Sequence, residues 1–263
     1  MTFELPRARI EPPLCAPHAA ACHGFLHSLE SGAAVDGPGM RFVFFLSGCQ
    51  FRCLYCHNPD TWKLHNGREV SVEDLLAEVA PLASFLKFAG GVTFSGGEPM
   101  MQAEFVNATA REIKARLGLH VALDTQGHLH ARVADDWFDP IDLVMLDVKH
   151  IDPERHQALT AQALQPTLDC AARMVRLGKK MRIRYVLVPG WTDGADEVAR
   201  MADYVASLGP SVELVEVLPF HQLGRAKWAG VGTAYQLSDT PTPSPDEAEA
   251  ARAVFRARGL IAC

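Results

Sequence analysis

The chain has 263 residues, 48% of them hydrophobic, so it is long enough to bury a sizeable core in one barrel-like α/β domain. Its formal net charge of -6 gives no global positive field that would favour nucleic acid or an anionic membrane as a partner. An odd number of cysteines, seven, and the lack of an apolar run of about 18 residues indicate a cytoplasmic protein, not a disulfide-rich or membrane-spanning one.

The first 23 residues are expected to form a poorly ordered extension, since they carry four prolines and no clear periodicity. The domain proper is expected over residues 24–263. From Gly24 the sequence predicts a short strand, and Val35–Gly39 predicts a tight turn. Asp36 in this turn is either a turn residue that bonds its own backbone or a side chain of the site, and the sequence leaves both interpretations open.

A fully apolar run, Phe42–Leu46, predicts a buried parallel strand that leads into a loop of three cysteines. Cys49, Cys53 and Cys56 are soft thiol ligands whose C-x3-C-x2-C spacing lets them converge on one metal centre. A 4Fe-4S cluster normally takes four cysteines, so three would leave one iron free to bind a ligand from outside the protein. The alternative is a structural zinc site with His57 as its fourth ligand.

The next predicted unit ends in a glycine-rich motif. Ser71 is expected to start a helix that Pro81 bends or ends, and a short strand at Val92–Phe94 follows. The Ser-Gly-Gly-Glu-Pro motif of residues 95–99 comes directly after this strand. Adjacent glycines let a backbone approach a ligand closely, and the Glu98 carboxylate can accept hydrogen bonds from an ammonium group; a plain turn is the alternative.

Polar side chains also follow the next two predicted strands. A helix over residues 102–117 leads to a strand at Val121–Leu123, which ends at Asp124 and Thr125. The clearest later strand, Ile141–Lys149, ends in a carboxylate and an amine two residues apart, which an extended backbone places on the same side. Helix capping is the alternative for the first pair, and a merely structural salt bridge for the second.

The last third of the chain predicts two further strand and helix units. They comprise a helix over residues 164–178, a strand with Arg184 that ends at Val188, a helix over 195–208, a strand over 212–218 and a terminal helix over 246–258. Arg184 belongs to a local basic run that a solvated face would also explain. His221 follows the final strand, and Trp228 indicates a lid or substrate loop.

Six strand and helix units without an internal repeat predict an α/β fold, an incomplete (β/α)6 TIM-like barrel. The polar motifs follow the carboxyl ends of strands, which in barrels form the face that carries the active site. We expect the barrel to be open on one side, because a macromolecular partner cannot reach atoms inside a closed eight-stranded barrel.

The cysteine loop resembles that of the radical S-adenosylmethionine (SAM) superfamily, which binds a 4Fe-4S cluster. The string Cys-Leu-Tyr-Cys-His-Asn-Pro-Asp-Thr-Trp at residues 53–62 is similar to that of the glycyl-radical enzyme activases within it, in particular the pyruvate formate-lyase type. No cysteine lies between His57 and Ser95, where many activases of other glycyl-radical enzymes carry a cysteine-rich insert. The resemblance extends from about Gly24 to the C-terminus and implies the partial barrel of the radical SAM type.

The resemblance implies a role for each matching residue. The implied cluster ligands are Cys49, Cys53 and Cys56. The implied SAM contacts are Tyr55, Cys56, His57, Gly96, Gly97, Glu98, Asp147, Val148, Lys149 and His221. The implied ligands of a monovalent cation are Asp124, Thr125, Met145 and Asp147, and the residues implied to face the peptide of the partner are Asp36 and Arg184.

The resemblance also implies the reaction and the partners. The reduced cluster would cleave SAM, and the 5'-deoxyadenosyl radical would take a hydrogen atom from the α carbon of a glycine in pyruvate formate-lyase, which leaves a glycyl radical. The enzyme is expected to be a cytoplasmic monomer of anaerobic metabolism with a flavodoxin- or ferredoxin-type electron donor and no nucleic-acid or membrane partner. The open alternatives are an activase of a different glycyl-radical enzyme, a zinc-stabilised binding module without catalysis and a thiol redox protein.

Overall fold

The computed structural model describes residues 22–263. The predicted N-terminal extension, residues 1–23, therefore lies outside the described residues except for its last two. Of these, Cys22 is buried and His23 begins the first strand, which we had predicted from Gly24.

The described chain forms one mostly parallel sheet of eight strands in the order β3-β1-β2-β4-β5-β6-β7-β8. The strands are β1 (His23–Ala33), β2 (Met40–Leu46), β3 (Arg68–Ser71), β4 (Gly90–Gly96), β5 (Val121–Thr125), β6 (Leu143–Asp147), β7 (Lys180–Leu187) and β8 (Val212–Pro219). β1 pairs antiparallel with β2 and β3, whereas β2 and β4 to β8 are parallel neighbours. β3 and β8 lie at the two edges, so within residues 22–263 the six parallel strands form an open barrel, as predicted.

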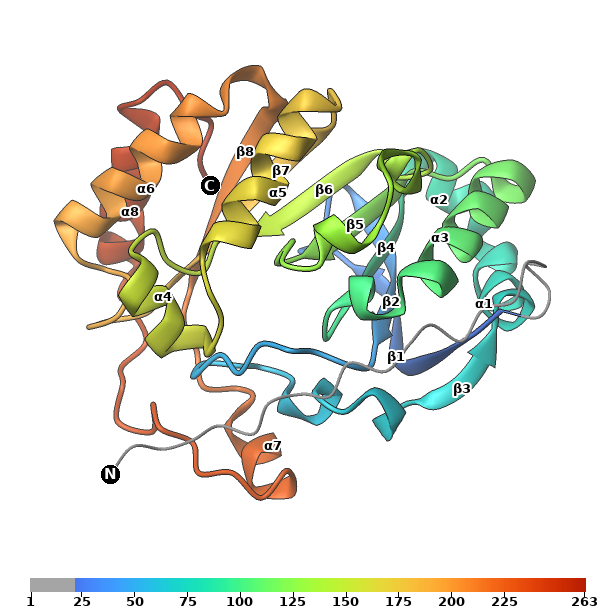
Figure 1. The fold of residues 1–263 in the computed structure, drawn as a ribbon, viewed down its shortest axis with the longest axis horizontal. Helices are drawn as coiled ribbons and strands as arrows, with labels where there is room; N and C mark the ends of the chain where they lie inside the picture. Colours follow the sequence, from blue (N-terminus) through green and yellow to red (C-terminus); the bar gives the residue numbers. More distant parts are fainter. Residues whose placement is uncertain (1–21) are drawn as a thin grey trace.

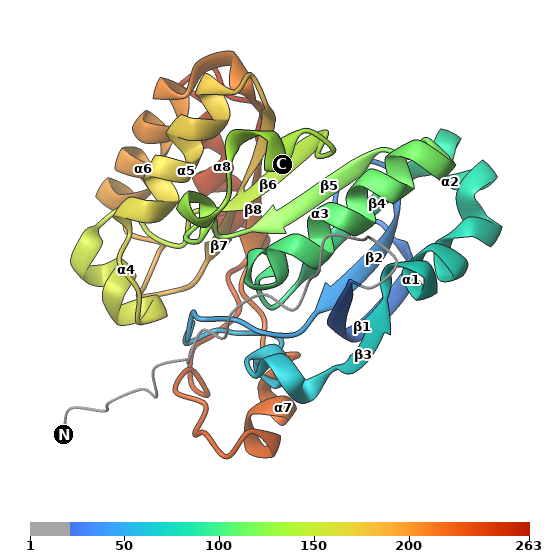
Figure 2. The ribbon, with the colours of Figure 1, turned by 45° about the vertical axis from the view of Figure 1, so that its right-hand side comes forward.

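Helices cover the outer face of the sheet in two groups. The helices are α1 (Val72–Val79), α2 (Ala83–Ala89), α3 (Ala103–Glu112), α4 (Pro153–Thr160), α5 (Gln165–Arg176), α6 (Ala195–Ser207), α7 (Arg225–Gly230) and α8 (Pro245–Arg256). Figure 1 shows α1 to α3 on the side of the sheet that holds β1 to β4, and α5, α6 and α8 beside β7 and β8. α7 lies apart from both groups of helices in Figure 1 and also in the turned view of Figure 2. Among the described residues, no helix is long and apolar enough to cross a membrane.

Local sequence explains where the first of these elements begin and end. The Ser71 side chain accepts a hydrogen bond from the backbone N–H of Asp74, and the Asp74 carboxylate accepts one from the Ser71 N–H, which forms a capping box at the start of α1. Leu75, Leu76 and Val79 line one face of α1 and are buried. Pro81 lies in a short 3-10 turn that separates α1 from α2, as its missing N–H requires.

Two helices are absent from our sequence prediction, α4 and α7. The Asp152 side chain caps the first turn of α4, and Pro153 takes the first helical position, so the chain did carry a helix start signal there. α7 covers only six residues within the segment that we predicted as a lid or substrate loop. β6 ends at Asp147, two residues before the end of the predicted strand.

Apart from a group of three, Ala122, Leu143 and Met145, the clustered buried apolar side chains fall into a large cluster between sheet and helices and a smaller one around the cysteine loop. The smaller cluster consists of Cys49, Phe51, Cys53, Leu54, Tyr55, Leu159, Val188, Phe220 and Leu237. It draws on the loops after β2, β7 and β8 and on α4. The cysteine loop therefore has an apolar core of its own, in addition to the core of the barrel.

Candidate active site

A cavity of about 510 Å³ lies at the carboxyl ends of the parallel strands. Most of the predicted site residues line it: Asp36, Cys49, Cys53, Tyr55, Cys56, His57, Gly96, Gly97, Asp124, Thr125, Asp147, Lys149, Arg184 and His221. Three do not: Glu98, Met145 and Val148 are fully buried and are not part of the lining. Motifs far apart in the sequence thus meet at one place, as parallel strands require of their carboxyl ends.

The three thiols of the cysteine loop line this cavity, where Cys49 and Cys53 are buried and Cys56 is partly buried. Burial raises the pKa of Cys49, Cys53 and Cys56, that of Cys53 to about 12. The side-chain N–H2 group of Gln126 lies 3.7 Å from the Cys49 sulfur. A thiol in such a pocket ionises only when a metal or another cation compensates its charge, which is the condition of a metal ligand.

The zinc alternative required His57 as the fourth ligand. The His57 ring instead packs edge to face against His221, with 4.9 Å between the ring centroids. No group of three or more His, Cys, Asp or Glu side chains within residues 22–263 has the arrangement of a site for a single metal ion. Three thiols without a fourth side-chain ligand suit a 4Fe-4S cluster with an open iron better than a closed tetrahedral ion.

The Gly-Gly-Glu motif is joined to the cysteine loop through its backbone. The Gly97 N–H donates to the Leu46 carbonyl (2.8 Å) and the Glu98 N–H to the Gly48 carbonyl (2.7 Å). A Cβ atom on Gly97 would lie 2.3 Å from the Gly48 oxygen, so only glycine allows the two loops to approach this closely. The motif is therefore more than a turn, because it fixes the position of the loop that carries Cys49.

The Glu98 side chain makes its hydrogen bonds within the protein. Its carboxylate accepts hydrogen bonds from the Thr125 hydroxyl (2.7 Å), the Met100 N–H (2.9 Å) and the Gln126 N–H (3.1 Å). Burial raises its pKa to about 7, against the opposing effect of these three donors. In this structure Glu98 connects the end of β4 to the end of β5.

Asp147 and Lys149 lie on the same side of the backbone, as their spacing predicted. The Lys149 ammonium is 2.8 Å from the Asp147 carboxylate and 5.7 Å from the centroid of the Tyr55 ring. Both side chains are mostly buried and line the cavity. The pair therefore presents a carboxylate and a cation close to the thiols.

Arg184, which is opposite Asp147 in the pairing of β6 with β7, is the centre of a second charged group. Its guanidinium is 2.9 Å from the Asp124 carboxylate and 3.4 Å from that of Glu216. One Asp124 oxygen accepts from this guanidinium and from the Ser95 hydroxyl, while the other is buried and has no partner among the described residues. Burial raises the pKa of Asp36, and the negative charge of Asp124 raises it further. Carboxylates thus exceed cations in this group.

Helix α4 holds the outer side of the cysteine loop. The Arg52 N–H donates to the Thr160 carbonyl (2.8 Å) and the Leu54 N–H to the Leu159 carbonyl (3.0 Å). The Gln162 side chain donates to the Gln50 carbonyl (3.0 Å). The last carbonyl groups of a helix lack partners within the helix, and here the cysteine loop supplies them.

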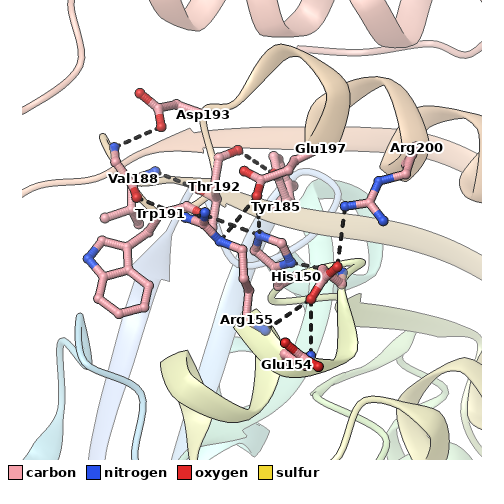
Figure 3. Close-up of polar contacts among 12 residues, drawn as sticks. His150, Glu154, Arg155, Tyr185, Val188, Trp191, Thr192, Asp193, Glu197 and Arg200 are labelled. Carbon is pink, nitrogen blue, oxygen red and sulfur yellow. Dashed lines mark hydrogen bonds and ion pairs between the residues drawn. The ribbon is translucent and has the colours of Figure 1, made fainter.

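A polar network then fixes α4 to α6 and to the loop after β7 (Figure 3). Arg155 of α4 lies 3.1 Å from the Glu197 carboxylate of α6 and donates to the Trp191 carbonyl (2.9 Å). His150 accepts from the Asp152 N–H at Nδ1 (2.9 Å), so its proton is on Nε2, which donates to the same Trp191 carbonyl (3.1 Å). Trp191 in turn packs against the small apolar cluster of the cysteine loop.

The segment with α7 covers the Cys56 end of the loop. The Trp228 indole N–H donates to the Cys56 carbonyl (2.9 Å), and the Lys227 ammonium lies 2.7 Å from the Asn58 side-chain oxygen. Trp228 is buried against Trp62, with 5.2 Å between the ring centroids. The residue that we predicted in a lid or substrate loop therefore packs on the loop that carries the thiols.

Our sequence reasoning missed several residues of the site. Gln126 lines the cavity one residue after a predicted pair, and the same argument from the strand end would have found it. Arg52 is buried beneath the loop, and its only signal was a charge between apolar neighbours in the cysteine motif. The contacts from α4 had no signal in the sequence, because they join segments about 100 residues apart by packing alone.

Comparisons with known proteins agree with this geometry. Residues 43–205 match the Radical SAM superfamily. The chain is 43% identical over 239 residues to the pyruvate formate-lyase 1-activating enzyme of Escherichia coli (strain K12), covering 90% of this chain and 96% of that protein. It is 39% identical over 246 residues to the pyruvate formate-lyase-activating enzyme of Staphylococcus aureus (strain USA300), covering 90% of this chain and 97% of that protein.

Solved structures share the fold. A domain of the pyruvate-formate lyase-activating enzyme from Bacteroides vulgatus ATCC 8482 matches with a TM-score of 0.54 and 23% identity, covering 66% of this chain and 98% of that one. A radical SAM methyltransferase from Sphaerobacter thermophilus matches with a TM-score of 0.61 and 16% identity, covering 85% of this chain and 65% of that one. The predicted fold class is thereby confirmed.

Proposed function

Since this chain belongs to the radical SAM superfamily and, within it, to the pyruvate formate-lyase activating enzymes, we propose that it installs a glycyl radical in pyruvate formate-lyase. The observation that carries the proposal is the meeting of the three thiols, the Gly-Gly motif, the Asp147 and Lys149 pair and His221 around one cavity. The family is one of enzymes with a 4Fe-4S cluster and SAM, so a zinc-stabilised binding module and a thiol redox protein are not retained.

The cluster would be held by Cys49, Cys53 and Cys56. Their convergence on one cavity supports this role, because three thiols from one loop can reach a single metal centre there. When bound, the cluster and SAM together supply one-electron reduction and hydrogen-atom abstraction from the α carbon of a glycine. The chain contributes the position of the thiols and, through its small apolar cluster, the exclusion of water.

The SAM molecule would occupy the cavity beside the thiols. The side chains proposed to face it are Tyr55, Cys56, His57, Asp147, Lys149 and His221, with the backbone at Gly96 and Gly97. Glu98 and Val148 would act from the layer behind this lining, since both are fully buried. The Asp147 and Lys149 pair offers an acceptor and a donor to a ligand that itself carries an amine and a carboxylate.

A monovalent cation would be held by Asp124, Thr125, Met145 and Asp147. Asp124 supports this assignment, because one of its buried carboxylate oxygens has no partner within residues 22–263. Met145 is directly opposite Asp124 in the pairing of β5 with β6, so the two residues come together through sheet register. A cation there would offset the excess of carboxylates around Arg184.

The glycine-bearing peptide of pyruvate formate-lyase would enter past Asp36 and Arg184. Both residues line the cavity, and the Arg184 guanidinium lies within 3.4 Å of the Val35 carbonyl in the same turn as Asp36. The open sheet, with β3 and β8 at separate edges, supports access by a large partner. As parts of the same proposal, residues 24–263 act as one domain in the cytoplasm, as a monomer supplied by a flavodoxin- or ferredoxin-type donor.

A cysteine substitution tests the cluster assignment. Cys53→Ala should lose most of its iron and all reductive cleavage of SAM under anaerobic conditions. Cys170→Ala is the matched control, since Cys170 is also a buried free cysteine but lies in α5 and does not line the cavity. Retained SAM cleavage by Cys53→Ala would contradict the proposal.

A second experiment identifies the partner. The wild-type protein is mixed with pyruvate formate-lyase or with another glycyl-radical enzyme, and paramagnetic resonance should show a glycyl signal only with pyruvate formate-lyase.

A further inference from the structure

Arg52 lies between Cys49 and Cys53 in the cysteine loop, and its side chain folds back beneath the loop. The side chain is buried, with 8% of the residue exposed. One guanidinium nitrogen donates to the Cys49 carbonyl (2.6 Å) and to the Phe51 carbonyl (2.7 Å). The guanidinium carbon lies 4.9 Å from the centroid of the Trp62 ring. The group is thus fixed on one side by the loop backbone and on the other by an aromatic face.

Among the residues that the structure describes, the charge of Arg52 has no acidic partner. No Asp or Glu within residues 22–263 forms an ion pair with it, whereas Arg184, Arg182 and Arg173 each contact a carboxylate. The ionisable groups that act on the Arg52 guanidinium are instead the three thiols of the loop. The two carbonyl groups satisfy N–H donors of Arg52 but carry no charge. A buried cation without an anion is costly, and an anionic group at the thiols would compensate it.

Three thiolates and a 4Fe-4S core together carry a net negative charge, and reduction adds one further electron. A fixed cation nearby stabilises the reduced state more than the oxidised state. We propose that Arg52 is the counterion of the cluster and a positioning residue of its loop, which raises the reduction potential of the cluster and holds the Cys49 and Phe51 carbonyl groups in place. This inference rests on the proposed 4Fe-4S site.

The test separates the charge of Arg52 from its hydrogen bonds. Arg52→Met removes both, whereas Arg52→Lys keeps the charge and loses the planar group that binds two carbonyls. The potential of the reconstituted wild-type protein and of each variant is measured by redox titration, with paramagnetic resonance of the reduced cluster as the readout. Arg52→Met should make reduction about tenfold less favourable, a shift of about 59 mV to more negative potential, and Arg52→Lys should stay close to wild type.

Arg182→Met serves as the charge-matched control, since it removes one positive charge from a mostly buried arginine that contacts Glu213 and Glu216. It should leave the potential unchanged. A wild-type potential in Arg52→Met, or the same shift in both Arg52 variants, would overturn the inference. If Arg52→Met takes up no cluster, full loading of Arg52→Lys supports the counterion role, and equal failure of the two variants overturns it. Failure of the proposed function is distinguished beforehand, because the wild type would then contain no iron and sulfide.

Discussion

His156 is a buried, neutral imidazole on the face of α4 that meets the cysteine loop. Its Nδ1–H donates to the Gln162 carbonyl (2.8 Å), and its ring packs edge to face on Phe51, with 5.8 Å between the centroids. Nε2 is buried and has no hydrogen-bond partner among the residues that the structure describes. Burial lowers the pKa of His156 to about 4. A protonated ring would therefore break the contact between α4 and the loop.

This residue predicts how stability depends on pH. An unfolded histidine titrates near pH 6.5, so between that value and about pH 4 the unfolded chain binds a proton that the folded chain does not. The folded state thus loses stability as the pH falls, by about 2 kcal/mol between about pH 7 and pH 5 from this group alone. His156→Gln keeps an N–H donor for Gln162 and should remove this part of the dependence. Urea unfolding at both pH values measures it, and an equal pH dependence in the two proteins would refute the assignment.

At the scale of elements, α4 contacts α6 and the loop after β7 on one side and the cysteine loop on the other, so it links their positions. Its last carbonyl groups accept from Arg52 and Leu54, and its first turn carries Arg155, which pairs with Glu197 of α6 (Figure 3). Glu197 is mostly buried, with 14% of its side chain exposed. An ion pair of this kind fixes orientation more than it adds stability, so its loss should be felt at the loop.

Two substitutions on α6 test this role. Glu197→Gln keeps the size of the side chain and removes its charge, which should cost about 1 kcal/mol of unfolding free energy and lower the iron retained after reconstitution. Asp203→Asn on the same helix removes the charge of an exposed ion pair with Arg258 and should change stability by less than about 0.5 kcal/mol, with iron content unchanged. Equal iron retention in the two variants would show that the network has no effect on the cysteine loop.

At the scale of the whole molecule, the two apolar clusters predict different responses to loss of the metal. The large cluster lies between the sheet and the outer helices, whereas the small one surrounds the thiols and is covered by the segment with α7. Metal binding stabilises the parts that form its site, and stability is not uniform across a fold.

Chelation of the iron should therefore open one part of the molecule first. We expect amide hydrogen exchange to rise at least tenfold over residues 49–62 and 220–237, while β5 and the helices of the large cluster keep their protection. Exchange that rises equally over α3 and α6 would show instead that the cluster supports the whole fold. Circular dichroism of the same samples checks that the barrel remains folded.

The sequence predicted an element of the fold correctly where the residues that cause it are close neighbours in the chain. The apolar run of β2, the Ser71 cap and the position of Pro81 act within a few residues, and the structure confirms all three. α4 carried a cap and a proline but too short an apolar pattern to be recognised. The hydrogen bond between Glu98 and Thr125 had no local signal, because it depends on the packing of β4 beside β5.

The sequence by itself determined the family chemistry: three soft ligands in one loop, a glycine pair after a strand, and polar residues after each later strand. It also determined the six parallel strands, because apolar runs of strand length alternate with amphipathic helices. Only the tertiary structure decided that Arg52 lies beneath the thiols without an acidic partner in residues 22–263, and that α4 and the segment with α7 enclose the loop from two sides. The contacts of α4 and of the segment with α7 join residues more than 100 positions apart. Whether a carboxylate lies near Arg52 depends on the packing of the whole described chain. No local sequence pattern predicts either feature.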